Sequence, residues 1–180
     1  MHVTLLKAAD AVMYRRLMLQ AYELAADAFT STAEERAAEP DAFWIKRVAD
    51  PTGLEAAFGA FDDHDLVGTV ALQFSEKPKT KHKAKIIGMF VDSKVRGLGI
   101  GRALLEAAIT YAEAKESIRQ LTLTVTEGNE PAISLYQSMG FQVFGLEPMA
   151  ILTPDGYKAK VHMWRSLQRN IRPSLNESFG

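Results

Sequence analysis

The chain has 180 residues, a formal net charge of −1 and no cysteine. The length corresponds to one domain, because domains typically hold about 100–200 residues. The composition excludes a disulfide scaffold, a thiolate zinc site and a catalytic cysteine, gives no general attraction to nucleic acid, and holds no apolar run near the roughly 18 residues of a membrane span. We therefore expect a single cytoplasmic domain with no nucleic-acid or membrane partner.

Hydrophobic periodicity predicts alternating strands and helices along the chain. In chain order the elements are a strand over 3–6, a helix over about 11–25, a helix over about 34–48, strands over 55–61, 66–74 and 86–91, a helix over about 99–115, a strand over 121–125, a helix over about 130–139, and strands over 141–146 and 157–164. This order is typical of an α+β fold around a mixed sheet.

Several residues mark where the predicted helices begin and end. Asp10 is placed to cap the first helix, and Thr32 with Glu35 fits a capping box before the second. Pro40 falls inside the second helical pattern and predicts a break there. Gly140 stands where a glycine commonly follows a helix. We expect one domain over residues 1–169 and a frayed tail over 170–180.

A run of lysines separates two of the predicted strands. Residues 77–85 include Pro78 and read as a loop or the approach to a strand. Lysines at every second position predict a solvated edge strand, because charged side chains protect an exposed sheet edge from pairing.

Residues 89–105 are the most informative part of the chain. A buried strand runs into a loop that contains Gly97, Gly99 and Gly101, and a helix begins inside this loop. Free amides at a helix start attract anions, and glycine lets phosphate oxygens approach the backbone. Arg96 and Arg102 can add charge-assisted hydrogen bonds. The segment therefore predicts a phosphate site.

Three phosphate-binding patterns compete for this loop. A P-loop ends in Gly-Lys-Ser/Thr, whereas Gly101 is followed by Arg102. The dinucleotide fingerprint needs Gly-x-Gly-x-x-Gly, which the glycines here do not match. The pattern Arg/Gln-x-x-Gly-x-Gly/Ala is matched by Arg96, Gly99 and Gly101 at every defined position. In this segment the chain resembles the GCN5-related N-acetyltransferase (GNAT) superfamily, and a purely structural strand–helix turn is the alternative.

A second motif, after the next predicted strand, supports the resemblance. The family carries Asn-x-x-Ala-x-x-Leu-Tyr-x-x-x-Gly-Phe, and residues 129–141 agree at every defined position. Helix capping, packing and helix termination explain most of these residues. These reasons do not explain Tyr136, which falls at the edge of the apolar face of the helix. It either has a functional role or is a tyrosine that packs at the edge of the core.

The resemblance implies a GNAT-like fold and acetyl-CoA as co-substrate. The fold would be a mixed, mostly antiparallel sheet of about seven strands, flanked by helices and splayed between the fourth and fifth strands. The backbone of Met89, Phe90 and Val91 would pair with the pantetheine arm, and Asn129 would reach the pantetheine or the phosphate side. The pyrophosphate would lie on the amides of Arg96, Gly97, Leu98, Gly99, Ile100, Gly101 and Arg102.

The resemblance also implies direct attack of an amine on the thioester. Tyr136 would protonate the leaving thiolate, since a phenol of pKa about 10 is a proton donor at neutral pH. Some members carry a glutamate at the position of Thr124, which cannot act as a base. We rank Glu127 first as the general base, ahead of Glu76 and Asp92, with a water relay as an equal alternative.

The function that we predict is N-acetylation of a primary amine on a small molecule. The alternatives are acetylation of a protein N-terminus or lysine, and acyl-CoA binding without turnover. In the family the acceptor pocket comes from the first helices and the final hairpin, here residues 22–36 and 149–157. The four histidines show no metal-ligand spacing, so no metal is expected. A homodimer is compatible with the sequence.

Overall fold

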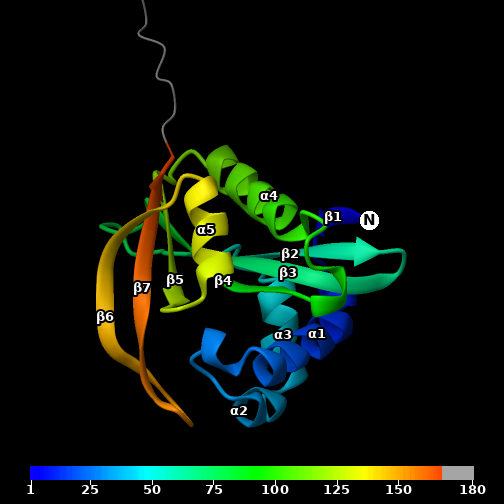
Figure 1. The fold of residues 1–180 in the computed structure, drawn as a ribbon. Helices are drawn as coiled ribbons and strands as arrows, with labels where there is room; N and C mark the ends of the chain where they lie inside the picture. Colours follow the sequence, from blue (N-terminus) through cyan, green and yellow to red (C-terminus); the bar gives the residue numbers. More distant parts are fainter. Residues whose placement is uncertain (168–180) are drawn as a thin grey trace, which may run out of the picture.

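The computed structural model describes residues 1–167, which form one seven-stranded mixed sheet (Figure 1). The strands are β1 (His2–Leu5), β2 (Glu55–Asp62), β3 (Asp65–Phe74), β4 (Lys83–Val91), β5 (Gln120–Thr126), β6 (Gln142–Thr153) and β7 (Gly156–Ser166). Their order in the sheet is β1-β2-β3-β4-β5-β7-β6. In the described chain β4 and β5 form the parallel pair, and the other neighbours are antiparallel. The predicted fold class is confirmed.

Helices cover both faces of the sheet (Figure 1). The α-helices are α1 (Ala11–Leu24), α2 (Ala33–Ala37), α3 (Asp41–Val48), α4 (Ile100–Ala114) and α5 (Glu130–Ser138), with short 3₁₀ turns η1 (Ala8–Asp10), η2 (Ala26–Ala28) and η3 (Ser93–Val95). Helices α4 and α5 lie on one face, and α1 to α3 lie on the other. Over residues 1–167, every helix is too short or too polar to cross a lipid bilayer.

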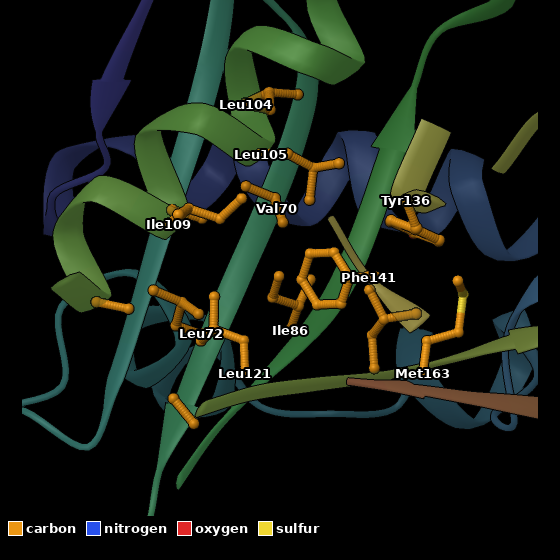
Figure 2. Packing of buried hydrophobic residues seen from close by; sticks show 14 of the residues in the cluster. Val70, Leu72, Ile86, Leu104, Leu105, Ile109, Leu121, Tyr136, Phe141 and Met163 are labelled. Carbon is orange, nitrogen blue, oxygen red and sulfur yellow. The ribbon is translucent and has the colours of Figure 1, made fainter. Parts of the chain in front are cut away.

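The larger core lies between the sheet and helices α4 and α5. Figure 2 shows Leu104 and Leu105 of α4 packed over Val70 of β3, with Leu121 of β5 and Phe141 nearby. Leu104, Leu105 and Leu121 are fully buried. Because these contacts join β3, β5 and both helices, this core holds the two halves of the sheet together on one side of the β4–β5 junction.

Strands β4 and β5 pair only where they begin. The paired residues are Lys83 with Gln120, Ala84 with Leu121, and Lys85 with Thr122. Beyond this point β4 continues to Val91 and β5 to Thr126 without further pairing to each other. A register shift in the β3–β4 pairing and a positive φ of 59° at Gly88 accompany the divergence. The strands therefore open as a V.

The structure confirms the predicted helix boundaries around Pro40. Thr32 and Glu35 form the capping box, with bonds of 3.1 Å from the Glu35 amide to Thr32 Oγ1 and 2.7 Å from the Thr32 amide to Glu35 Oε2. Pro40 separates α2 from α3 and caps α3. The proposed frayed tail over 170–180 lies outside the described residues.

Two expectations were wrong. The lysine run does not form an edge strand: β4 begins at Lys83 and lies between β3 and β5, while residues 75–82 form a loop. Alternation misled here because Ala84 packs in the core while Lys83 and Lys85 are exposed on the opposite face of a central strand. Strand β6 continues to Thr153 rather than ending near residue 146, past an irregularity where Met149 has a φ of 51°.

We predict that Leu121→Ala lowers the free energy of unfolding by about 2–5 kcal/mol, because it leaves a cavity under the β4–β5 junction. Leu152→Ala is the matched control, since Leu152 is 73% exposed on β6, and its effect should stay within about 0.5 kcal/mol. Denaturant unfolding measures both values. Equal effects of the two substitutions would contradict the packing described here.

Candidate active site

A cavity of about 820 Å³ occupies the V between β4 and β5. Its walls come from β4, the loop before α4, the start of α4, β5 and α5, and it is bounded on the α1 side by residues 24–30 and on β7 by Lys160. All the predicted site residues line it except Leu98 and Glu127. Two motifs that lie apart in the sequence thus meet in one cavity.

The β4 wall offers backbone rather than side chains. Phe90 and Val91 pair with β3 through Thr69 and Gly68, so their other backbone edge faces the gap. The Phe90 ring is buried against Leu17 and Ala21 on the α1 side. An unpaired strand edge next to a cavity can accept an extended ligand as an added strand.

The loop before α4 leaves several backbone amides without a helical partner. Gly97 and Gly99 have φ values of 83° and 77°, and a Cβ at either position would meet no heavy atom within 4 Å. Gly99 is the N-cap of α4 and provides no side-chain hydrogen bond to its first turn. The amides of Ile100, Gly101 and Arg102 therefore have no helical partner, and their geometry suits phosphate oxygens.

The two arginines of this loop differ in their contacts. Arg96 is exposed and its Nε donates to the Val91 carbonyl at 3.3 Å. The Arg102 guanidinium instead donates to Ser138 Oγ at 2.9 Å and to Met139 Sδ at 3.1 Å, which ties α4 to α5. At the anion site Arg102 thus offers its backbone amide, while its side chain is engaged with α5.

Tyr136 projects from α5 toward the cavity and is 8% exposed. Burial raises the pKa of its phenol to about 12, so the group stays protonated at neutral pH. Its hydroxyl donates to Met89 Sδ at 3.5 Å. Because a thioether is a weak acceptor, the phenol proton is available to a better acceptor in the cavity. Asn129 caps α5 by accepting from the Ala132 amide at 3.4 Å.

The cavity holds no carboxylate among the residues that the structure describes. Thr124 lines it at the middle of β5. Glu127 follows the end of β5 and is exposed, and its amide donates to the Ala159 carbonyl at 3.0 Å. Over residues 1–167, no group of three His, Cys, Asp or Glu side chains could hold a metal ion.

Lys160 of β7 is the cavity residue that sequence reasoning missed. It is 4% exposed, and its Nζ donates to Thr126 Oγ1 at 2.7 Å and to the Ala28 carbonyl at 3.2 Å. Burial is the main cause that lowers its pKa. The alternation with Val161 and Met163 predicts only a strand, and a buried lysine has no local signature.

Residues 24–30 bound the cavity on the α1 side, and hydrogen bonds attach this segment to β5 and β7. The Asp27 carbonyl accepts from Thr126 Oγ1, the Asp27 carboxylate pairs with Lys158, and the Ala28 carbonyl accepts from Lys160. Phe29 lines the cavity and packs edge-on against Tyr22 at 4.7 Å. Of the two regions expected to form the acceptor pocket, residues 149–157 do not line the cavity. The region 22–36 reaches it through Leu24, Ala25, Ala28, Phe29 and Thr30.

Comparisons with known proteins agree with this geometry. The profile of the acetyltransferase (GNAT) family matches residues 18–141. The L-amino acid N-acetyltransferase AaaT of Escherichia coli is 30% identical over 125 residues, which cover 69% of this chain and 76% of that protein. The peptidyl-lysine N-acetyltransferase YjaB of E. coli is 42% identical over 57 residues, about a third of each chain.

Solved structures share the whole fold. The structure of yncA from Salmonella typhimurium with its cofactor acetyl-CoA superimposes with a TM-score of 0.77 at 18% identity, over 98% of this chain and 99% of that one. A GNAT-family acetyltransferase from Streptococcus pneumoniae superimposes with a TM-score of 0.77 at 22% identity, over 93% and 99% of the two chains.

The buried phenol of Tyr136 predicts a pH dependence of stability. Above about pH 10 an unfolded tyrosine loses its proton, whereas folded Tyr136 keeps its proton up to a pKa of about 12. The folded state thus binds more protons in this range, and stability should fall as pH rises. Tyr136→Phe should flatten this slope in denaturant melts between about pH 10 and 12. A slope equal to that of the unmodified protein would contradict the burial of this phenol.

Proposed function

The chain belongs to the acetyltransferase (GNAT) family, and we propose that it transfers an acetyl group from acetyl-CoA to the primary amine of a small molecule. The observation that carries the proposal is the continuous cavity along the β4–β5 gap. This cavity joins the uncapped start of α4 to the phenol of Tyr136. One ligand with a phosphate end and an extended arm could bind the start of α4 and also reach Tyr136.

The residues present fit acetyl-CoA in this cavity. The amides from Arg96 to Arg102 would hold the pyrophosphate, with Leu98 contributing only backbone because its side chain is 67% exposed. The free edge of Met89, Phe90 and Val91 would pair with the pantetheine amides. Asn129, which caps α5 at the cavity wall, would contact the arm near its phosphate side. Acetyl-CoA, when bound, supplies a thioester activated toward amines.

The proposed reaction is direct transfer in a ternary complex. The chain contains no cysteine, so an acetyl-cysteine intermediate is excluded and a sequential order is favoured. The acceptor nitrogen attacks the thioester carbon and the carbon–sulfur bond breaks. Tyr136 then donates its proton to the leaving sulfur. A backbone amide of the gap would stabilise the charge that develops on the carbonyl oxygen.

A small-molecule acceptor is favoured by the contacts that bind residues 25–30 to β5 and β7. These contacts, through Asp27 and Ala28, hold in place the segment that bounds the cavity on the α1 side, where a bulky acceptor would have to enter. The similarity to an L-amino acid N-acetyltransferase covers more than twice as many residues as the similarity to a peptidyl-lysine N-acetyltransferase. Acetylation of a peptide amine is the second candidate, and acyl-CoA binding without turnover is the third.

We predict that acetyl-CoA raises the melting temperature, by an amount that corresponds to about 2.7 kcal/mol at one hundred times its Kd. Gly99→Ala should weaken acetyl-CoA binding by about tenfold or more, because alanine disfavours the positive φ that opens the anion site. Gly53→Ala is the matched control, since Gly53 has a φ of 70° and equally open surroundings in a distant turn. Equal binding by both variants would contradict the assignment of this site.

The reaction itself is tested by release of CoA thiol across a panel of amines. We expect release with free L-amino acids or small aliphatic amines, and slower release with peptides that carry a free N-terminus or lysine. Thiol release with peptides alone would favour the second candidate. Binding without any release across the panel would favour the third.

Tyr136→Phe should lower kcat by about 10²–10⁴-fold, the usual contribution of a positioned acid, while the affinity for acetyl-CoA stays unchanged. Tyr157→Phe serves as the control, because Tyr157 is 60% exposed and does not line the cavity. A kcat that survives Tyr136→Phe would rule out its role as the acid.

A further inference from the structure

We infer that Lys160 is the catalytic base of this site, and that its amine in the uncharged form accepts the proton of the acceptor ammonium. The inference rests on the proposed function, because it assigns a step of that reaction. Among the described residues, the side chains that line the cavity include basic groups but lack a carboxylate. Lysine, arginine and tyrosine line it, but no aspartate or glutamate of the described residues does, so a carboxylate base is missing where an acetyltransferase needs a proton acceptor.

The position of Lys160 suits this task. It lies on β7 opposite Thr126, at the end of β5 where the V is open. It lines the same cavity as Tyr136 and Thr124, and little of it reaches bulk solvent. Lys85, the other lysine of the cavity, is exposed to bulk solvent.

The hydrogen bonds of Lys160 are compatible with an uncharged amine whose lone pair is free to accept a proton. Its two acceptors are the Thr126 hydroxyl and the Ala28 carbonyl. The Thr126 proton is itself donated to the Asp27 carbonyl, so Thr126 Oγ1 must accept from Lys160. An uncharged amine has two N–H groups, which these acceptors use, and its lone pair stays free. Both partners are uncharged, so neither holds the ammonium form in place as a carboxylate would.

The charged groups around Lys160 have opposing effects. Lys85 on β4 disfavours the ammonium form, whereas Asp27 on η2 and Glu147 on β6 favour it. Both carboxylates have other partners: Asp27 pairs with Lys158, and Glu147 lies 2.9 Å from His162. Burial outweighs these charges, and the pKa of Lys160 is lowered from its usual 10.5. Lys160 thus becomes a better match to an acceptor ammonium near neutral pH.

Lys160 and Tyr136 together account for every proton that moves during the acetyl transfer. The acceptor enters as an ammonium, and Lys160 accepts its first proton. The freed amine attacks the thioester carbon, the carbon–sulfur bond breaks, and Tyr136 gives its proton to sulfur. The new amide nitrogen loses its second proton to the Tyr136 oxygen, which restores the phenol. Lys160 then releases its proton to solvent.

Glu127 is the competing base that the sequence suggests. It is exposed beyond β5 and outside the cavity lining, so it would act only through intervening water. The two assignments differ in a simple way: Glu127→Gln should abolish the proton-accepting step if Glu127 is the base, and should leave it intact if Lys160 is.

The experiment measures kcat and kcat/KM against pH for the unmodified protein and for four variants, with the fastest acceptor of the amine panel. The variants are Lys160→Arg, Lys160→Met, Glu127→Gln and Lys83→Met. Lys160→Arg keeps the hydrogen-bonding capacity and carries a permanent positive charge, but it cannot accept a proton. Lys160→Met removes both. Lys83→Met is the matched control, an exposed lysine of β4 outside the cavity lining. We expect both Lys160 variants to lose about 10²–10⁴-fold in kcat, with the acid limb of the profile altered, and the control to match the unmodified protein.

Retention of activity by Lys160→Arg would overturn the inference, because it would show that positive charge is sufficient at this position. Loss in Glu127→Gln together with an unaltered profile in Lys160→Arg would overturn it in favour of Glu127. Melting curves and acetyl-CoA binding of each variant separate a chemical loss from misfolding. Absence of thiol release by the unmodified protein would instead refute the proposed function.

A titration without turnover gives a second test. The chemical shift of the Lys160 side chain, assigned by its loss in Lys160→Arg, is followed against pH by NMR in the unmodified protein. We expect Lys160 to titrate below the usual lysine range of about 10.4, and the signal of Lys83 serves as the internal comparison. A Lys160 midpoint at or above the usual lysine value would overturn the inference without any measurement of turnover.

Discussion

The early end of pairing between β4 and β5 is the constraint on which the rest of the site depends. Three residue pairs join the strands, and the remainder of β4 presents unpaired backbone groups to the gap. Buried backbone groups need partners, so a gap of this kind favours an extended ligand. The core of α4 and α5 supports one side of the opening, and residues 25–30 bound the other.

Two kinds of nitrogen group line this opening, and they have different roles. The start of α4 attracts anions through backbone amides, while the guanidinium of Arg102 ties α4 to α5. Lys160 is buried on β7, with its amine hydrogen-bonded to uncharged oxygens. A net charge of −1 for the whole chain conceals this local distribution, because the carboxylates lie outside the cavity.

The fold was largely predictable because its signals are local. Capping by Thr32 and Asn129, the break at Pro40 and the glycines before α4 act within a few residues of themselves, so periodicity and motif spacing locate the elements. The edge strand predicted from the lysine alternation was wrong, since charge at every second position describes one face of a strand and not the position of that strand in the sheet. The predicted end of β6 was also wrong, because its pairing with β7 continues past an irregularity.

The sequence alone determined the order of elements, the glycine loop before α4 and the absence of a thiol nucleophile, because each depends on residue identity and short spacing. Tertiary structure decided where the strands separate and which residues meet in the gap. Lys160 illustrates the difference: β7 brings it to Thr126, and residues 25–30 return from α1 to bury it. Burial and hydrogen bonding between distant segments set its chemistry, and no local pattern encodes them.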